Sequence, residues 1–454
     1  MNHFRQVDRE TAYLLPPSVD EWLPADHLAR FVVEIVEQLD LSKLASQYRG
    51  SGSAAYHPQM LAQLLIYGYA TGTYSSRMIE RACYDSIAFR YVAANTHPDH
   101  DTLCSFRRRF LPELEQIFVQ VLAIAQQMKL LKLGTIALDG TKMHANASRH
   151  SALSYARAGE IEARLQNEVT QLLARAEQSD QSEAQAALDI PAELALRATR
   201  LAAIAEAKAE IERRAAERLE REQLEYQAKL AAREQKEKER GKRPGGRPPA
   251  PPTGGVRSTD QVNLTDPESR IMPRAGGGGF EQSYNAHAAV DTDSMLIVAA
   301  RLTEAPVDAR QIEPMLAQLA ALPKALGRVD TLIADAGFFS AANAQKCESA
   351  KVTPLIARRR DQHHRSWLDR LAEPAALPSD ADAVQRMLHR LQTPSGRALY
   401  GLRKQTVEPV FGIIKHAMRF RQFLLRGKRK VTGEWQLVAL SYNLRRMANL
   451  AAAA

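Results

Sequence analysis

The stretch TIALDGTK (Thr135–Lys142) decides the fold, and the stretch DTLIADAGFF (Asp330–Phe339) repeats its pattern. Each contains an apolar, β-like run that ends in an aspartate followed by a tight turn. A third stretch, TVEPVFGIIK (Thr406–Lys415), opens a helix with a glutamate in its first turn and carries a lysine seven residues later. Two carboxylates at strand ends and one on a helix are oxygen ligands of the kind that hard cations such as Mg²⁺ prefer. A metal-dependent phosphoryl-transfer site needs such a set.

Composition bounds the class of protein. The chain has 454 residues, of which 45% are hydrophobic, so it can bury a large core divided over about two to four domains. A formal net charge of +9 and a pI near 9.4 favour a polyanionic partner, and charge alone does not separate nucleic acid from an acidic membrane surface. No apolar run of about eighteen residues and no signal-peptide pattern is present, which predicts a cytoplasmic protein. The three cysteines lie far apart without a CxxC pair, which argues against a disulfide framework and against a zinc site.

Residues 1 to about 133 have the pattern of an all-helical region. Pro58 suits the first turn of a helix, Gly72-Thr73 would end that helix, and Ser75 or Ser76 would start the next one. A further short helix carries a cluster of arginines. The members of this cluster are Arg107, Arg108 and Arg109. Short helices with such a cluster are typical of a helix-turn-helix DNA reader, and the alternative is a helical bundle whose arginines lie on a solvated face.

From about Tyr155 to Lys238 the composition shifts to Ala, Glu, Arg, Gln and Leu. Apolar residues follow a heptad-like seam that Arg197 and Lys208 interrupt, and we expect a helical hairpin of coiled-coil type. The sequence does not decide whether this hairpin dimerises the protein or contacts DNA. The following segment, Gly241–Gly255, is rich in Pro, Gly and basic residues, and we expect it to be flexible because it has no means of packing.

Beyond residue 256 the chain returns to alternating strands and helices. Tyr284–Val290 and Met295–Leu302 read as the two strands of a hairpin, and Val352–Ile356 reads as a later strand. Asp308 is expected to cap one helix and Ser340 to start another. From about residue 382 the pattern is helical to the end.

This order of elements, with carboxylates after the first and fourth strands, favours an RNase H-like α/β fold, in which helices flank a mixed sheet. We predict a helical N-terminal DNA-binding domain over residues 1–133 and a catalytic domain formed by residues 134–154 and 256–454. Residues 155–240 would form the helical hairpin insertion, and residues 241–255 the flexible linker.

Each acidic residue is a weak signal by itself. Asp139 precedes glycine and Asp335 precedes Ala-Gly, and both combinations are common in turns. Glu408 could simply favour the helix dipole in a first turn. Their joint placement is stronger, and Lys415 and Arg419 lie on the helical face next to Glu408, where two cations could contact phosphate oxygens. The alternative for this face is a solvated row of ion pairs.

A family resemblance rests on several longer segments. They are LDGTKMHANASRHSALSY (138–155), SYNAHAAVD (283–291), LIADAGFFS (332–340) and RKQTVEPVFGIIKHAMRFRQFLLRG (403–427). These segments resemble the DDE transposases of bacterial insertion sequences, whose catalytic domain is RNase H-like. The segment HPQMLAQLLIYGYATGTYSSRMIERA (57–82) resembles their helical N-terminal domain.

The resemblance implies an activity and the residues that perform it. Asp139 would be the first acid, Asp335 the second and Glu408 the third, and together they would hold Mg²⁺ or Mn²⁺ for phosphoryl transfer on DNA. Many relatives carry a Tyr-x2-Arg-x3-Glu-x6-Lys signature around the third acid. Here Glu408 and Lys415 keep their spacing, Lys404 stands where the arginine is expected, and Tyr400 is one residue out of register. In SYNAHAAVD a histidine, His287, stands where glutamine is expected.

The implied partner is double-stranded DNA, namely the terminal inverted repeats of the element and the target, bound by a homodimer in the nucleoid. The segment 415–430 is rich in arginine and lysine and has no acidic residue, so it suits phosphate contacts. The residues predicted to contact DNA are Arg107, Arg108, Arg109, Lys404, Arg419, Arg421, Arg426 and Lys428. Trp435 is expected to be a core residue.

Three other classes of protein are less consistent with the sequence. A P-loop NTPase fails because Gly140-Thr141-Lys142 lacks the Walker glycine spacing. An RNase H-like nuclease that cuts without strand transfer shares all the site residues. A domesticated DNA-binding protein would keep the basic residues but would need no acids.

Overall fold

A computed structural model describes residues 18–48, 55–180, 189–242, 245–274, 277–358 and 374–453. The chain divides into two compact units. Unit 1 comprises Met1–His144 and Tyr284–Ala454, and unit 2 comprises Ala145–Ser283. Each unit is described by itself.

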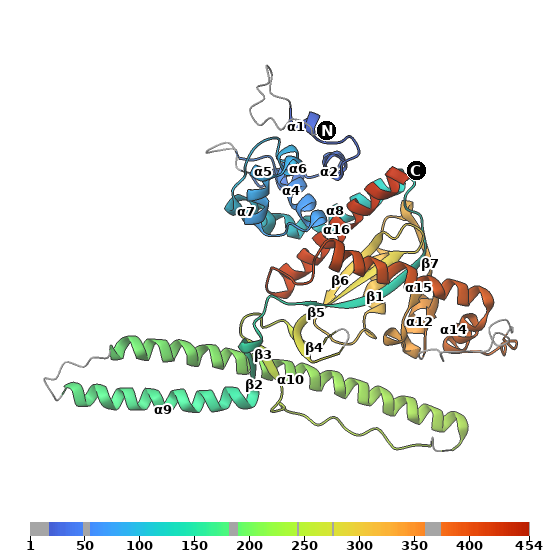
Figure 1. The fold of residues 1–454 in the computed structure, drawn as a ribbon. Helices are drawn as coiled ribbons and strands as arrows, with labels where there is room; N and C mark the ends of the chain where they lie inside the picture. Colours follow the sequence, from blue (N-terminus) through green and yellow to red (C-terminus); the bar gives the residue numbers. More distant parts are fainter. Residues whose placement is uncertain are drawn as a thin grey trace, which may run out of the picture. The chain divides into compact units, whose positions relative to one another are not determined.

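Unit 1 begins with a helical region. Its helices are α1 (Val19–Trp22), α2 (Leu28–Glu37), α3 (Ser42–Ala45), α4 (Pro58–Thr71), α5 (Ser76–Asp85), α6 (Ile87–Val92), α7 (His100–Phe110) and α8 (Leu114–Gln127) (Figure 1). The predicted signals hold at α4, which begins at Pro58 and ends at Thr71, where Gly72, with a φ of +85°, caps the helix. Ser75 caps α5 by accepting the Met78 N–H at 3.2 Å.

The second part of unit 1 is a mixed sheet. Its strands are β1 (Leu133–His144), β5 (Phe280–Asp291), β6 (Ile297–Thr303), β7 (Gly327–Ala334) and β8 (Thr353–Ile356). Strand β5 pairs with β6 in antiparallel fashion and also neighbours β1, while β1, β7 and β8 follow in parallel. Within unit 1 the order is therefore β6-β5-β1-β7-β8, and β4 (Arg270–Pro273) adds a sixth strand that pairs with the first residues of β5. The prediction of an RNase H-like α/β sheet is confirmed.

Helices cover this sheet and join it to the helical region. They are α11 (Ile312–Ala320), α12 (Ala341–Ser349), α14 (Ala383–Gln392), α15 (Pro394–Gly412) and α16 (Lys428–Ala453). Helix α16 packs on β6 and also against α4 and α8. Its Glu434 is fully buried and accepts the hydroxyl proton of Tyr69 in α4 at 2.9 Å. Trp435 is also fully buried, as predicted.

Three local predictions are wrong. Gly140-Thr141 is not a turn, because β1 continues to His144. Asp308 does not cap α11, since Gln311 precedes that helix and the Asp308 carboxylate contacts the sheet instead. Glu408 is not in a first turn, because Thr393 caps α15 by accepting the Gly396 N–H at 3.0 Å, well upstream.

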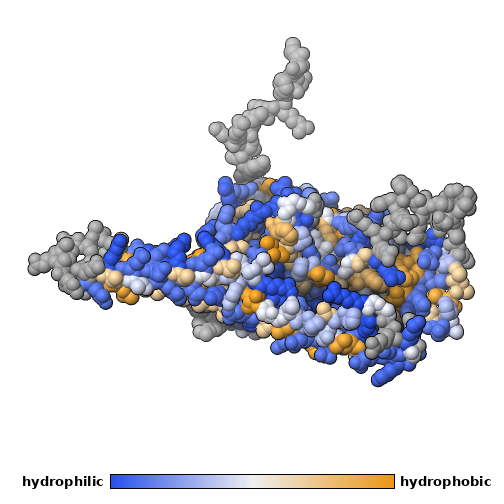
Figure 2. Space-filling view, turned by 90° about the horizontal axis from the view of Figure 1, so that it is seen from below, coloured by the Kyte–Doolittle hydropathy of each residue, from blue (hydrophilic) through white to orange (hydrophobic). Residues whose placement is uncertain are grey.

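Unit 2 contains the predicted helical hairpin, formed by α9 (Tyr155–Asp180) and α10 (Ile190–Arg240), with the short strands β2 (Ala152–Ser154), β3 (Gln261–Asn263) and β4 (Arg270–Pro273) at its base. Leu165, Ile204 and Ile211 belong to its buried core. Lys208 donates to Glu162 of α9 at 2.7 Å, so this cation in the apolar seam is paired across the hairpin. Figure 2 shows a mostly hydrophilic surface on the hairpin, with single hydrophobic side chains between.

Two further features of unit 2 concern its connections. Residues 245–255, expected to lack packing partners, run beside α10, and Arg233 donates to the carbonyl of Gly246 at 3.0 Å. The ends of unit 2 lie together, because the Ala145 N–H donates to the Gln282 carbonyl at 2.9 Å.

Candidate active site

Two of the predicted acids lie at the same level of neighbouring parallel strands. In the β1–β7 ladder Leu138 pairs with Ala334, so Asp139 is the next residue of β1 and Asp335 is the first residue after β7. Paired parallel strands lie about 4.8 Å apart, which brings the two aspartates side by side at the centre of the sheet.

Asp139 is held in a largely dry environment. Burial raises the pKa of its carboxyl to about 6, and the negative charges of Asp335 and Asp308 act in the same direction. The N–H of Gly140, which donates at 2.7 Å, and the cation of Arg403 oppose this rise. Asp139 is therefore a carboxylate whose ionised form is costly until more positive charge reaches it.

Asp335 is fixed by the turn that follows β7. Its carboxylate accepts the N–H of Gly337 at 2.9 Å and so caps the short 3-10 turn Ala336–Phe338. The turn predicted after this aspartate is present, in contrast to the one predicted after Asp139.

The third predicted acid, Glu408, is linked to Asp139 by an arginine that contacts both carboxylates. Glu408 lies in α15 with half of its side chain exposed, and Arg403 of the same helix contacts its carboxylate at 3.0 Å. The other terminal nitrogen of Arg403 lies 3.3 Å from the Asp139 carboxylate. The Arg403 side chain is only 14% exposed, and its guanidinium stands between the two acids.

Arg403 was missed by the sequence analysis, which placed Lys404 at the arginine position of the signature. The signal was present, because Tyr400 and Arg403 keep the Tyr-x2-Arg spacing one residue earlier than expected. Lys404 is exposed. Within the ranges that the structure describes, no three side chains of His, Cys, Asp or Glu are grouped so that they could hold a metal ion. This fits a site in which a guanidinium stands between two of the acids.

Lys415 lies in a short π-helical turn, Ile413–Ala417, that follows α15. Its ammonium group donates to the hydroxyl of Thr141 and, at 3.2 Å, to the carbonyl of Lys142. Lys415 therefore ties this turn to the strand that carries Asp139.

A second polar cluster lies behind the aspartates. Asp308 accepts from Asn285 at 2.6 Å, contacts His287 at 2.9 Å and lies 3.6 Å from the Lys142 ammonium. Burial opposes ionisation of Asp308, but these hydrogen bonds and the charge of Lys142 outweigh it and lower the pKa of the carboxyl. His287 is fully buried, and burial lowers its pKa. No sequence pattern pointed to this cluster, because its members come from different elements.

Gly140 shows how closely this cluster approaches β1. A Cβ atom at this position would lie 2.7 Å from Nε2 of His287 and 3.0 Å from Oδ1 of Asp308. Real Cβ atoms essentially never approach a neighbour as closely as 2.7 Å, so any larger residue after Asp139 would force the His287 ring to shift.

The predicted DNA-binding residues differ in their surroundings. Arg107 is buried and donates to the Tyr74 carbonyl at 3.4 Å, so it stabilises the helical region. In contrast to the prediction, its side chain is not exposed for a contact with DNA. Arg108 and Arg109 are exposed, and the latter lies over the ring of Tyr48 at 5.5 Å.

The cations near the C-terminus are exposed. They are Arg419, Arg421, Arg426 and Lys428. Lys428 pairs with Glu304 at 2.9 Å, and Arg421 donates to the Lys415 carbonyl at 3.1 Å. Phe420 and Phe423, which alternate with these cations in the sequence, are buried. The phenylalanines therefore belong to the core, and the cations form the surface.

Comparison with protein families gives two matches. Residues 17–109 match a transposase domain (DUF772), and residues 256–444 match the transposase DDE domain. The chain belongs to the DDE transposases. The DDE match includes Asp335 and Glu408 of this transposase, whereas Asp139 lies between the two matched ranges. No curated protein and no solved structure shows a significant similarity to the chain.

As a DDE transposase, the protein is an enzyme of DNA transposition, and its family implies the use of a divalent metal. The predicted acids suit such an ion, because carboxylates are hard oxygen ligands. In addition, the negative charges of Asp335 and Asp308 raise the pKa of Asp139, and a cation would offset this effect. No helix among the described residues has the length and apolar character needed to cross a membrane.

Proposed function

We propose that this transposase binds the terminal inverted repeats of its own insertion sequence and performs metal-dependent strand cleavage and strand transfer. In the first step water hydrolyses a phosphodiester at the transposon end. In the second step the freed 3′-hydroxyl attacks a phosphodiester of the target DNA. The observation that supports this most strongly is the ladder register, which makes Asp139 and Asp335 neighbours.

The acids have separate tasks in this proposal. Asp139 and Asp335 would hold Mg²⁺ or Mn²⁺, and Glu408 would join them once Arg403 no longer bridges it to Asp139. When bound, the metal supplies electrostatic stabilisation of the attacking and leaving oxygens. Lys415, held beside β1 by Thr141, would offer a cation to a DNA phosphate. No protein nucleophile is required.

The exposed cations support the DNA partner. Arg108, Arg109, Lys404, Arg419 and Arg421 are exposed and could contact phosphates. Arg426 and Lys428 would extend this contact. We further propose a homodimer on DNA in the nucleoid, because two transposon ends must be brought to one target.

The experiment is cleavage of a labelled duplex that carries the terminal repeat, in the presence of Mg²⁺, by the wild type and by Asp139→Asn, Asp335→Asn and Asp335→Ala. The matched control is Asp330→Asn, which removes an exposed carboxylate of β7 that pairs only with Arg328 among the described residues. We expect the three variants of the acids to bind the repeat without cutting it, and the control to cut and join like the wild type.

Other outcomes would support the other functions. If the variants of Asp139 and Asp335 lose both repeat binding and cleavage, the two aspartates have a structural role. Cleavage without joining to target DNA would indicate a nuclease, and binding without cleavage by the wild type would indicate a domesticated DNA-binding protein.

A further inference from the structure

The long helix α10 has two halves with different surroundings. Its first half runs beside α9, and the two helices stay together as far as Glu212, whose carboxylate accepts the hydroxyl proton of Tyr155 at 2.7 Å. Further along, the extended segment 245–255 runs beside the helix in place of α9 (Figure 1). Helix and segment together form a groove of about 660 Å³.

Several cations of α10 between Lys208 and Arg218 are paired within unit 2. Lys208 pairs with Glu162 at 2.7 Å, and Arg218 pairs with Asp260 at 2.8 Å. Arg213 and Arg214 both contact Glu210, at 2.7 and 2.6 Å. These charges stabilise the hairpin and its base, and they have little left to offer a partner.

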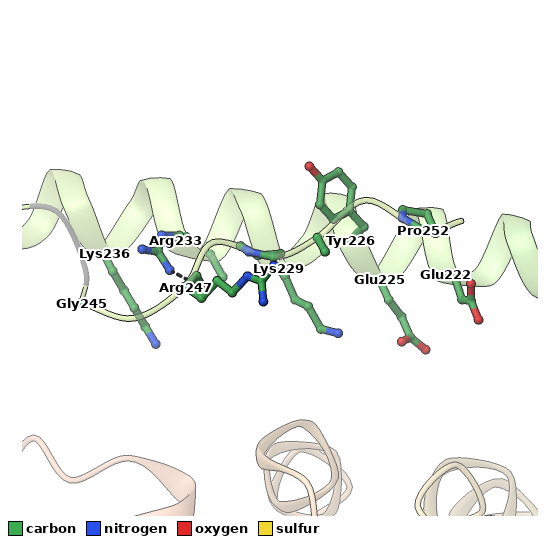
Figure 3. A pocket seen from close by; sticks show the side chains of 12 residues that line it. Glu222, Glu225, Tyr226, Lys229, Arg233, Lys236, Gly245, Arg247 and Pro252 are labelled. Carbon is green, nitrogen blue, oxygen red and sulfur yellow. Dashed lines mark hydrogen bonds between the residues drawn. The ribbon is translucent and has the colours of Figure 1, made fainter. Parts of the chain in front are cut away.

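The groove has the opposite character. We call it the basic groove, and the cations that line it are Lys229, Arg233, Lys236 and Arg247. Lys229, Lys236 and Arg247 are exposed, and none of these three forms an ion pair within the described residues. Figure 3 shows the side chains of Lys229 and Lys236 extending to the same side of the helix.

The groove has a defined shape, because the segment 245–255 that closes it is hydrogen-bonded to α10. Arg233 donates to the carbonyls of Gly246 and Arg247, at 3.0 and 3.5 Å, and this places the Arg247 side chain beside Lys229 and Lys236 (Figure 3). Glu222 and Glu225 line the other end of the groove. Among the lining residues, the cations therefore lie at the end of the groove nearer to the C-terminus of α10.

We infer that the basic groove is an accessory DNA-binding surface that contacts the phosphate backbone without reading sequence. Lys229 and Lys236 are seven residues apart, about 10 Å along a helix. A duplex carries one charge per about 1.7 Å of its axis, so this row of cations can face several phosphates. An amphipathic membrane helix would need a broad apolar face, which this charged face does not provide.

The test compares two triple variants of the full-length protein. Lys229→Gln, Lys236→Gln and Arg247→Gln together remove three charges from the groove. The control removes three exposed charges from α9 and the first half of α10, with Arg164→Gln, Arg175→Gln and Arg200→Gln. Affinity for a short duplex of random sequence is measured over about 50–200 mM salt.

The groove variant is expected to show a shallower slope of log affinity against log salt, by about 2 to 3, because each lost phosphate contact removes about 0.9. The control is expected to keep the slope of the wild type. Equal slopes for both variants would overturn the inference. A groove variant that keeps the slope but loses self-association in sedimentation would instead assign the groove to a second copy of the chain.

The inference and the proposed function fail separately. A wild type that binds random DNA through the groove yet never cuts a repeat end refutes the proposed function alone. A groove variant with unchanged salt dependence that still cuts and joins refutes the accessory surface alone.

Discussion

Arg403 lies 3.3 Å from Asp139, although 264 residues separate them in the chain. The same guanidinium contacts Glu408, so one cation neutralises two of the predicted acids. A divalent cation at this place would take over that task, and Arg403 would have to give way to it.

The first prediction follows from this competition. Arg403→Gln should lower the stability of the metal-free protein by about 1–3 kcal/mol, because a nearly buried carboxylate loses its ionised partner. Mg²⁺ should then raise the melting temperature of the variant more than that of the wild type, as measured by scanning calorimetry. The matched control is Lys404→Gln, an exposed neighbour, which should behave like the wild type. An equal or smaller Mg²⁺ effect in Arg403→Gln would contradict the competition.

The second prediction concerns pH. The pKa of Asp139 is raised from 3.8 to about 6, so in metal-free protein the folded state holds this proton where the unfolded state has lost it. The stabilising contribution is full below about pH 4 and is lost as the pH rises through about 6. Asp139→Asn, which cannot ionise, should therefore gain stability over the wild type between pH 4 and 7, by at most about 3 kcal/mol. Urea titrations in EDTA across this range would measure the difference, and a constant difference would refute the buried carboxylate.

The third prediction compares two glycines of β1. Gly140→Ala should destabilise the protein by about 1–3 kcal/mol, because the new methyl group would meet His287 and Asp308. Gly134→Ala should be neutral or stabilising, because its new methyl group meets nothing within 4 Å and alanine costs less backbone entropy than glycine. Melting temperatures of the two variants test this directly. Similar values would mean that the cluster behind Asp139 yields to the methyl group.

The fourth prediction concerns the joint between the helical region and α16. Tyr69→Phe should cost about 1–3 kcal/mol, because buried Glu434 loses the hydroxyl that donates to it at 2.9 Å. Tyr84→Phe removes a hydroxyl from a tyrosine whose side chain is exposed, and it should cost almost nothing. If both variants unfold at the same urea concentration, the Tyr69–Glu434 hydrogen bond does not stabilise this joint.

Local sequence patterns predicted most of the sheet and the hairpin. Short apolar runs that end in aspartate or meet a turn gave β6, β7 and β8, and the heptad-like seam gave α9 and α10. Lys208 weakened that seam in the sequence, but the structure shows that Glu162 of the partner helix compensates it. A seam position can be basic when the facing position is acidic.

The errors have physical causes. A run of three arginines cannot share one solvated face, because successive helical residues are turned by about 100°. Arg107 lies four residues after Leu103 and three before Phe110, which places it on the same face of the helix as these two buried residues. Its burial could therefore have been predicted from the sequence. The cluster of Asp308 and His287 could not be predicted from the sequence, because Asp308 lies in the loop between β6 and α11 and its carboxylate meets side chains of two different strands, His287 of β5 and Lys142 of β1.

The contact between Ala145 and Gln282 has a consequence for how the chain folds. Strands β1 and β5 are neighbours in the sheet, yet nearly all of unit 2 lies between them in the sequence, which raises contact order and would slow folding. Because the two ends of unit 2 are hydrogen-bonded to each other, prior folding of unit 2 would shorten the effective loop that β1 and β5 must close. The insertion then adds little loop-closure entropy, and the chain can carry it between two paired strands without delaying the formation of the sheet.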